Sequence, residues 1–311
     1  MTKRSGVASD SGRVRELNED RSFVDDERGI YLVVDGVGGH AAGDLAAEIA
    51  LATIAAELGE GPDVGLRDVG LNNVELRIRR AITAANNEIY SKATSDETLR
   101  GMGCVLTLAV LHDGRMTVGH VGDSRLYLIW NGGLRKLTSD HSPVGEKEDR
   151  GELSEEEAML HPRRHEVFRD VGSHRRDASD EDFIEVREFV FKPDAAVLLC
   201  SDGLTDMLTS PEILAIVERY DGDPQQTARE LVEAANEAGG LDNVTAVFVA
   251  GPDFLGAGSS TMIDARTRHS VTRQRPFRLG HLFAGRGAFL IYGFALGILI
   301  GFLAWKFALM R

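Results

Sequence analysis

Apolar runs that stop at an aspartate are the feature that most limits what this chain can fold into. In the stretch from Tyr31 to Asp44, "YLVVDGVGGHAAGD", such a run ends at Asp35, and four of the next eight residues are glycine. Short runs that are rich in β-branched residues and bounded by Gly or Asp are typical of strands. Further runs of this kind predict strands within residues 103–114, 115–133, 183–191, 195–203 and 243–251.

Turn signals between these runs predict how the strands are connected. Asp113-Gly114 and Asn131-Gly132 are dipeptides that favour tight hairpins. Strands that are adjacent in sequence and joined by tight hairpins pair antiparallel. The sequence therefore predicts an antiparallel sheet rather than a doubly wound parallel one, and with helices an α+β sandwich.

Four helices are expected around these strands. One begins near Gly43, and a second spans residues 72–92, where apolar side chains recur at helical spacing. Two more begin with a capping side chain followed by proline, at Ser210-Pro211 and at Asp223-Pro224. Because the helices come in pairs, we expect them to form layers over the sheet.

Charge is distributed unevenly along the 311 residues. The net charge is −14, but the segment from Asp264 to the end has eight Lys or Arg against one acid, a net of +7, which leaves about −21 for the first 263 residues. An acidic body argues against nucleic acid as a partner, because the phosphate backbone is bound by Lys and Arg. Cys104 and Cys200 stand in apolar runs and provide no disulfide framework, which indicates a reducing compartment.

Residues 287–305 form a run of nineteen residues without a charge. As a helix this run would span about 28 Å, roughly the hydrocarbon thickness of a bilayer. A buried core helix is the alternative, but such a helix usually has a polar face and this run has none. We therefore predict a transmembrane helix, after a folded domain at 1–252 and a flexible basic linker at 253–286, and before a short tail at 306–311.

The residues around the apolar run predict its orientation. Six arginines precede it, whereas only Lys306 and Arg311 follow, so the positive-inside bias places the N-terminal part in the cytoplasm, anchored to the cell membrane by a single pass. Gly293, Gly297 and Gly301 form two overlapping GxxxG spacings, which are compatible with a dimer through the helix. The alternative is that glycine is simply common in such helices.

Six aspartates mark the ends of strands or the turns beside them. They are Asp20, Asp35, Asp123, Asp202, Asp206 and Asp242. Carboxylates that converge at one sheet edge repel each other unless cations lie among them. Oxygen ligands suit Mg²⁺ or Mn²⁺, and Gly36 leaves a backbone carbonyl within reach of such an ion. The alternative, that Asp-Gly pairs merely make turns, is sufficient for one pair but not for several.

The motifs and their order resemble the metal-dependent protein serine/threonine phosphatases of type 2C, in their bacterial form. The resemblance covers Val7 to Ala250 and rests on "SDSGRVRELNED", "VVDGVGGHAAGD", "GMGCVLTLAV", "GHVGDSRLYL", "LLCSDGLTDML" and "GGLDNVTAVFV". It implies a four-layer α-β-β-α sandwich with two central antiparallel sheets. This agrees with the α+β pattern of the strands and helices.

The resemblance also implies roles for individual residues. Asp35 would bridge two Mn²⁺ or Mg²⁺ ions, and the carbonyl of Gly36 would bind one of them. Asp202 and Asp242 would complete the coordination of the other ion. Glu19 and Asp20 would act through waters bound to the ions. A third, weaker ion would be held by Asp202, Asp123 and Asp206, and Arg15 matches the phosphate-binding arginine of the family.

These roles imply hydrolysis of phosphoserine and phosphothreonine on cytoplasmic or membrane-proximal proteins, the substrates of a kinase in the same cell. A water between two cations would attack phosphorus in line, with no phosphoenzyme, while Arg15 binds two phosphate oxygens. One alternative is an inactive, membrane-tethered phosphoprotein-binding module, which the retention of all six aspartates disfavours. Another is a metal-dependent phosphoesterase for small phosphoesters such as nucleotides, which the absence of a P-loop motif disfavours.

Two segments depart from the commoner family pattern. Val37 stands where many eukaryotic relatives have a histidine that serves as general acid, and His40 cannot be assumed to replace it, so a water is the expected proton source. Residues 142–172 match the variable flap, where Ser154 to Glu157 predicts a capping box. His161 and His165 are four apart, as in a zinc pair, but Pro162 breaks the helix geometry that such a pair needs.

Overall fold

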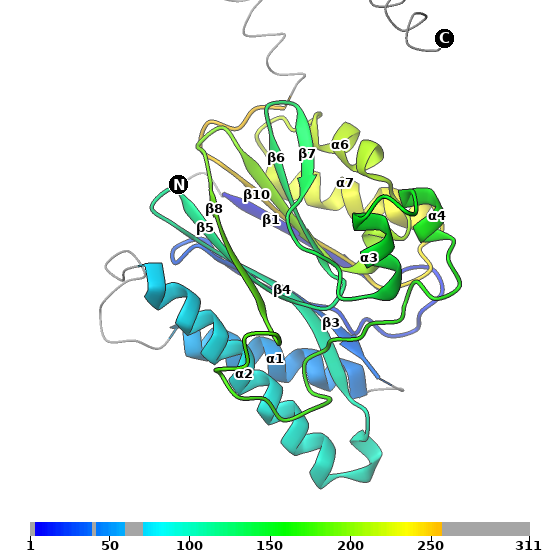
Figure 1. The fold of residues 1–311 in the computed structure, drawn as a ribbon. Coiled ribbons are helices and arrows are strands. Elements are labelled where there is room, and N and C mark those ends of the chain that lie inside the picture. Colours follow the sequence, from blue (N-terminus) through cyan, green and yellow to red (C-terminus); the bar gives the residue numbers. More distant parts are fainter. Residues whose placement is uncertain (1–3, 39–41, 60–70, 257–311) are drawn as a thin grey trace, which may run out of the picture. The chain divides into compact units, whose positions relative to one another are not determined.

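The computed structural model describes residues 4–38, 42–59 and 71–256 and contains two five-stranded antiparallel sheets (Figure 1). The first sheet has the order β1-β10-β9-β6-β7: β1 (Ser5–Asp10), β10 (Val244–Ala250), β9 (Ala196–Cys200), β6 (Arg125–Trp130) and β7 (Gly133–Lys136). The second sheet has the order β2-β3-β4-β5-β8: β2 (Arg21–Asp25), β3 (Ile30–Val37), β4 (Gly103–His112), β5 (Arg115–Val121) and β8 (Glu185–Val190). The predicted antiparallel α+β class is confirmed.

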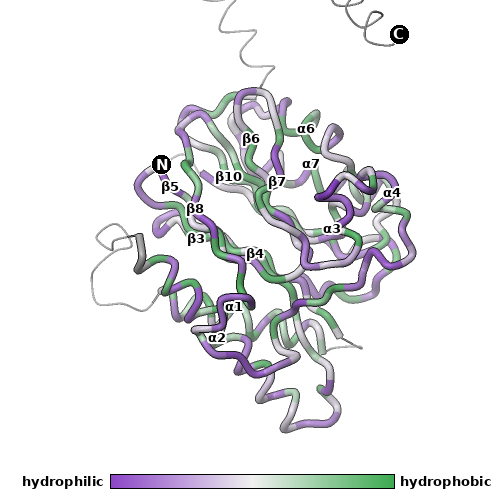
Figure 2. The backbone as a smooth tube through the Cα atoms, viewed as in Figure 1, coloured by the Kyte–Doolittle hydropathy of each residue, from purple (hydrophilic) through white to green (hydrophobic). Residues whose placement is uncertain are grey.

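Helices cover the outer face of each sheet. Helices α1 (Ala42–Gly59) and α2 (Leu71–Ser95) share an apolar cluster with the second sheet. Helices α5 (Asp202–Thr205), α6 (Ser210–Val217) and α7 (Pro224–Glu237) share another with the first sheet. A third cluster lies between the two sheets, so the layers are helix, sheet, sheet and helix. In Figure 2 the apolar colouring follows the strands.

Strand β4 shows why the two sheets can stack. All ten of its residues are buried. Leu106 and Leu108 belong to the cluster under α1 and α2, whereas Ala109 belongs to the cluster between the sheets. Because side chains alternate across a strand, a strand covered on both faces needs apolar residues at successive positions. The continuous run "GCVLTLAVLH" meets that need.

Both predicted hairpins are confirmed. His112 pairs with Arg115, and Trp130 pairs with Gly133, which leaves a two-residue loop in each case. Asp113 and Asn131, the first loop residues, have φ values of 48° and 54°, and the glycines that follow have φ values of 72° and 71°. Positive φ at both loop positions is the geometry that Asn-Gly and Asp-Gly favour.

Two helix starts and one capping box were predicted at nearly the right places. The side chain of Asp223 caps α7 by accepting from the backbone N–H of Gln225 at 2.9 Å, as predicted. The predicted cap at Ser210 is wrong by one residue, because Thr209 caps α6 in a capping box with Glu212. The capping box of Ser154 is confirmed at the start of α4 (Glu155–Met159), which follows α3 (Pro143–Asp149).

The sequence did not show three of the strands. Strands β1, β2 and β7 are short and carry few β-branched residues, and β1 owes its place to pairing with β10 at the other end of the chain. The run at 115–133 also divides into β5 and β6, which belong to different sheets. The break is at Gly122, whose φ is 109° and where a Cβ atom would lie 2.2 Å from the side chain of Val105.

Several predictions fall outside the described residues. They concern the apolar run at 287–305, the tail, most of the linker, the three spaced glycines and His40. Among the residues that the structure does describe, no helix is both long enough and apolar enough to cross a bilayer.

Candidate active site

Five aspartates from separate elements converge at one end of the two sheets. Asp35 lies two residues before the end of β3, Asp123 lies in the turn between β5 and β6, Asp202 begins α5, Asp242 precedes β10 and Asp20 precedes β2. Burial raises the pKa of Asp35 well above its usual value, and the charges of the other four raise it further. The structure therefore brings together the carboxylates that the sequence placed at strand ends.

Asp20 offers an oxygen that no protein group satisfies. Its side chain is 3% exposed, and the hydroxyl of Ser201 donates to Oδ2 at 2.7 Å. Within the described residues, Oδ1 is buried without a hydrogen-bond partner. Burial raises the pKa of Asp20 to about 7, although the hydrogen bond from Ser201 opposes the shift. A buried carboxylate oxygen in this condition suits a cation or a water held by one.

Packing requires glycine at position 36. A Cβ atom there would lie 2.3 Å from the carbonyl oxygen of Gly43, in the first turn of α1, and 2.9 Å from the carbonyl oxygen of Glu19. The end of β3, the start of α1 and the segment that carries Glu19 therefore meet with no room for a side chain. Burial raises the pKa of Glu19, although the charge of Arg15 opposes the shift.

Arg15 lies at the solvent-exposed edge of the cluster of aspartates. Its Nη2 atom lies 2.8 Å from Oδ2 of Asp242, while its side chain is 53% exposed. The charge of Asp242 is the largest influence on the pKa of Arg15 and raises it, with smaller contributions from Asp202 and Glu19. The guanidinium is therefore open to solvent on one side and faces the carboxylates on the other.

Asn243 fixes the loop that carries Arg15, and sequence reasoning missed it. Its side-chain oxygen accepts from the backbone N–H of Glu19 at 2.8 Å, and its side-chain nitrogen donates to the carbonyl of Leu17 at 2.8 Å. Because Asn243 directly follows Asp242, these bonds join the Arg15 loop to the segment that carries Asp242. The motif "LDNVT" contained the signal, since a buried asparagine before an apolar strand needs partners.

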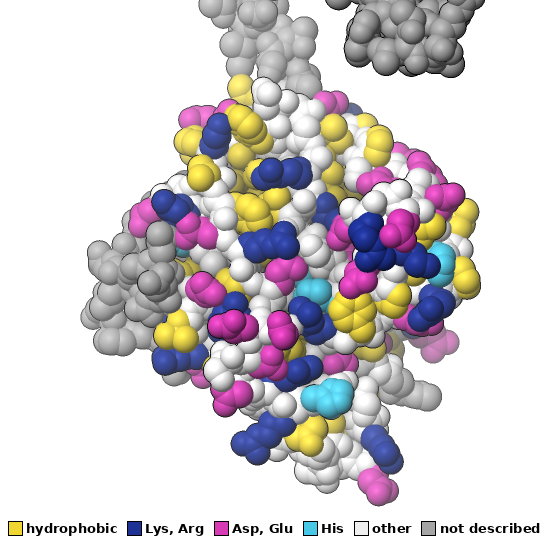
Figure 3. Space-filling model, in the orientation of Figure 1, with side chains coloured by type: hydrophobic (Ala, Val, Ile, Leu, Met, Phe, Trp, Pro, Cys, Tyr) yellow, Lys and Arg dark blue, Asp and Glu magenta, His cyan; other side chains and the backbone are white. Residues whose placement is uncertain are grey.

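The flap, residues 142–172, also reaches the carboxylates. Nε of Arg164 lies 2.9 Å from Oδ2 of Asp206, and Nδ1 of His165 lies 3.6 Å and 3.7 Å from Oδ2 of Asp202 and Asp206. His165, Asp202 and Asp206 place ligand atoms within 4.8 Å of one another, a group that could hold a metal ion; His161 is not part of it. Figure 3 shows basic and acidic side chains mixed over the flap helices.

Neither cysteine is suited to act as a nucleophile. Cys104 and Cys200 are free and fully buried. Burial raises the pKa of Cys104 well above its usual value and that of Cys200 to about 12. Both thiols are therefore protonated near neutral pH, and they act as small apolar side chains.

The cluster of aspartates predicts that the stability of the metal-free protein depends on pH. The raised pKa values of Asp35, Asp123, Asp20 and Asp206 mean that the folded state binds protons more tightly than the unfolded chain does. Stability without metal should therefore fall as pH rises through those values. We expect a higher unfolding midpoint in EDTA at about pH 6.5 than at about pH 8.5.

The control for this prediction is the protein saturated with Mn²⁺, in which cations favour the ionised carboxylates and the difference should shrink or change sign. Thermal unfolding followed by circular dichroism measures both series. An EDTA series with equal midpoints, or with the higher midpoint at the higher pH, would show that the carboxylates do not repel each other.

Arg164 predicts a competition between the flap and a cation. Its guanidinium lies where a cation bound to Asp206 would meet it, so Arg164→Ala should tighten the binding of a weakly held Mn²⁺ roughly fivefold, as for a partly exposed ion pair worth about 1 kcal/mol. Titration calorimetry measures the change. Arg163→Ala is the matched control, because the side chain of Arg163 pairs with Glu166 on the exposed flap surface. Unchanged affinity in the Arg164 variant would contradict the competition.

The fold and the site together define a class of protein: a two-sheet sandwich whose strand ends gather aspartates, as in metal-dependent phosphatases. The chain belongs to the protein phosphatase 2C family, whose sequence profile matches residues 12–238. It is a serine/threonine phosphatase of this type, and the phosphatases of the family use metal ions.

Named relatives and solved structures agree with this assignment. The serine/threonine phosphatase stp of Listeria monocytogenes is 37% identical over 246 residues, which is 78% of this chain and 93% of stp. The phosphatase PstP of Mycobacterium tuberculosis is 31% identical over 82% of this chain and 46% of its own length. The crystal structure of PstP/Ppp superposes with a TM-score of 0.68 at 31% identity, over 79% of this chain and 98% of that one.

One of the solved structures contains metal. The catalytic domain of PstP in complex with two manganese ions has a TM-score of 0.67 and 30% identity, over 79% of this chain and 97% of that one. In the present chain, the unpartnered oxygen of Asp20 and the convergence of the aspartates fit such ions. Hard divalent cations prefer this set of oxygen ligands.

Proposed function

We propose that this phosphatase hydrolyses phosphoserine and phosphothreonine by a two-cation mechanism with Mn²⁺ or Mg²⁺. The observation that carries the proposal is the convergence of five aspartates from separate elements around the buried Asp35, whose pKa their charges raise, beside the partly exposed guanidinium of Arg15. So many carboxylates repel one another at neutral pH, and divalent cations relieve that repulsion.

Each residue has a distinct task in this proposal. Asp35 would bridge two cations, the Gly36 carbonyl would bind one, and Asp202 and Asp242 would hold the other. Glu19 and Asp20 would act through waters, for which the free oxygen of Asp20 provides the acceptor. When bound, the two cations supply positive charge at the phosphate and lower the pKa of a water that serves as nucleophile.

Arg15 would bind and orient the phosphate. Because one side of its guanidinium is exposed, Arg15 can bind a phosphate either while it keeps the contact with Asp242 or after it breaks that contact. A planar guanidinium binds two phosphate oxygens and stabilises the charge that develops on them in the transition state. Val37, which is 41% exposed next to Gly36, has no proton to give, so we propose that a water protonates the leaving oxygen.

A third and weaker cation would bind Asp202, Asp123 and Asp206. Burial raises the pKa of Asp123, and the charges of Asp202 and Asp206 add to the shift, which indicates that the three lie close together. The contacts of Arg164 and His165 with Asp206 lie at the same place. Asp123→Ala should therefore leave two tight ions bound and slow the reaction.

Release of phosphate from a phosphothreonine peptide by the full-length chain, with Mn²⁺ and with EDTA, tests the proposal. We expect turnover only with the metal. A chain that binds the peptide without releasing phosphate would be the phosphoprotein-binding module instead. Faster hydrolysis of nucleotides than of the peptide would identify a phosphoesterase for small substrates.

The sequence alone supports a proposal about location and partners. We propose that residues 287–305 anchor the chain in the cell membrane, with the phosphatase on the cytoplasmic side, and that the anchor can pair into a dimer. Its substrates would then be membrane-proximal proteins phosphorylated by a kinase of the same cell. The full-length protein should pellet with membranes and resist high salt, and external protease should spare the catalytic domain in intact cells. A soluble full-length protein would contradict the anchor.

A further inference from the structure

A buried polar segment beside the site has no task in the proposed mechanism. Within residues 138–142, four polar residues are almost fully buried: Thr138, Asp140, His141 and Ser142, which are 3%, 5%, 6% and 2% exposed. Burying polar groups is unfavourable unless their hydrogen bonds are made. The partners of these four side chains therefore indicate what the segment holds in place.

His141 holds both backbone groups of Gly122, the residue before Asp123. The backbone N–H of His141 donates to the carbonyl of Gly122 at 2.7 Å. In return, the backbone N–H of Gly122 donates to Nδ1 of the His141 ring at 3.0 Å. Because a main-chain N–H can only donate, Nδ1 accepts, and the ring proton of neutral His141 lies on Nε2.

The other side of His141 faces the end of the flap. Its Nε2 atom, which carries the ring proton, lies 3.6 Å from Oε2 of Glu185, the acceptor on this side. Nη1 of Arg169 lies 3.0 Å from the same Nε2 and is itself a donor, so in this tautomer the two nitrogens are in close contact without a hydrogen bond. Its carbonyl accepts from the backbone N–H of Phe168 at 2.9 Å. One residue thus contacts the turn that carries Asp123 and the segment by which the flap returns to the sheet.

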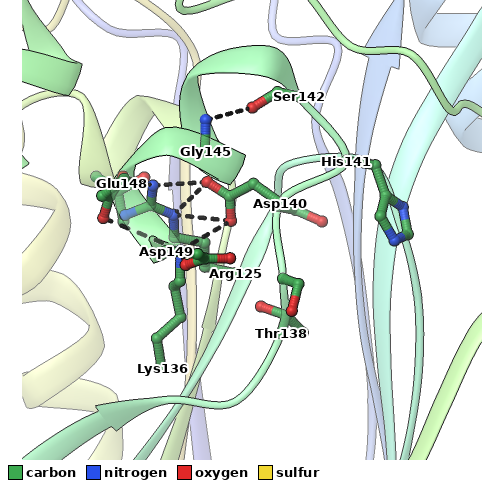
Figure 4. A network of polar contacts seen from close by, with 12 residues as sticks. Arg125, Lys136, Thr138, Asp140, His141, Ser142, Gly145, Glu148 and Asp149 are labelled. Carbon is green, nitrogen blue, oxygen red and sulfur yellow. Dashed lines mark hydrogen bonds and ion pairs between the residues drawn. The ribbon is translucent and has the colours of Figure 1, made fainter. Parts of the chain in front are cut away.

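The neighbours of His141 leave it little freedom to move. The guanidinium of Arg125 binds Asp140 through Nε and Nη2, with Nη2 at 2.6 Å, and the same Nη2 lies 2.6 Å from Glu148 (Figure 4). Ser142 caps α3 by accepting from the backbone N–H of Gly145 at 2.9 Å. The two residues that flank His141 are therefore fixed to β6 and to the first flap helix.

We infer that His141 is a positioning residue, which sets the Gly122–Asp123 turn so that the Asp123 carboxylate faces the cation position beside Asp202 and Asp206. The inference rests on the proposed function, because it presupposes that Asp123 binds a cation. The Nδ1 acceptor is the essential feature. Without it, the Gly122 N–H would be buried and unpaired, and the turn would shift to satisfy it.

Two substitutions separate this acceptor from the rest of the ring. The side-chain oxygen of asparagine is as many bonds from the backbone as Nδ1, whereas the polar atoms of glutamine reach as far as Nε2. His141→Asn therefore keeps an acceptor for Gly122, and His141→Gln keeps only the contact with Glu185 and Arg169. His112→Gln is the control. His112 is about as buried as His141, but it is the last residue of β4 and lies at the hairpin with β5, away from the Gly122–Asp123 turn.

Calorimetric titration of the full-length chains with Mn²⁺ provides a readout besides activity. We expect His141→Gln to weaken the weakly held Mn²⁺ about tenfold, as for a buried donor left unpaired, and to leave the tight ions unchanged. His141→Asn and His112→Gln should bind all ions as the parent does. Parent-like binding by His141→Gln, or equal weakening in all three variants or in both His141 variants, would overturn the inference.

Thermal unfolding of each variant excludes a trivial loss of fold. If His141→Gln does not fold, His141→Asn decides alone: unchanged affinity for the weak ion supports the acceptor role, and weakened affinity refutes it. A parent chain that binds no Mn²⁺ at all would contradict the proposed function rather than this inference alone.

Discussion

Asp35→Asn should abolish phosphatase activity and leave the fold intact. We expect turnover at saturating Mn²⁺ to fall roughly thousandfold or more, because cations at a phosphoryl centre contribute several kcal/mol of transition-state stabilisation and each 1.4 kcal/mol is a factor of ten. Asparagine keeps the shape of the side chain but removes the charge that would hold two ions. Phosphate release from a phosphothreonine peptide measures the loss.

The same variant should be at least as stable as the parent in EDTA. Burial and four neighbouring aspartates raise the pKa of Asp35, so its charge destabilises the metal-free fold at neutral pH, and asparagine carries no charge. Asp194→Asn is the matched control, because Asp194 accepts a hydrogen bond from the indole of Trp130 away from the site. Wild-type turnover in the Asp35 variant would show that the bridging role belongs elsewhere.

Arg15→Ala should lower kcat/KM for a phosphopeptide by about 10² to 10³, the range for losing a group that stabilises transition-state charge. Both parameters should change, with KM rising and kcat falling, because Arg15 would bind phosphate before and during the reaction. Steady-state kinetics on the full-length protein separate the two. Arg13→Ala is the control: Arg13 is an exposed neighbour on the same loop.

Arg15 also contacts Asp242, which makes a second measurement necessary. If the variant loses activity only because Asp242 is displaced, the affinity for the tight Mn²⁺ ions should change, whereas a phosphate-binding role leaves it unchanged. Equal kinetics for the Arg15 variant and its parent would reduce Arg15 to a surface arginine that happens to lie near the carboxylates.

The aspartates at strand ends could be predicted from sequence. The apolar run that marks a buried strand also determines where the strand ends, and so where the aspartate after it lies. An apolar run that stops at Asp35 or Asp202 places the carboxylate at the edge of a sheet whose faces are covered. The hairpins were equally predictable, since Asp113 and Asn131 adopt the positive φ that their dipeptides favour.

Contacts between distant segments could not be predicted in this way. Arg164 and Asp206 are 42 residues apart, and nothing in the flap sequence shows which aspartate its arginines will meet. The pairing of β1 with β10 has the same character, because short strands with Gly and Ser carry little pattern of their own and depend on a partner elsewhere. Asn243 is a further case, since the partner of its side-chain oxygen in the Arg15 loop lies 224 residues away in sequence.

The pairing of the first strand with the last has a consequence for biosynthesis. Ser5 lies opposite Val249, and Asp10 lies opposite Val244, so among the described strands β1 has no neighbour in its sheet until β10 has been made. The loop that carries Arg15 likewise waits for Asp242 and Asn243. A chain that still lacks these residues cannot assemble the site. A product truncated before the end of β10, or a nascent chain of that length, should therefore have no activity on phosphoproteins. Activity thereby reports that translation has passed the end of β10.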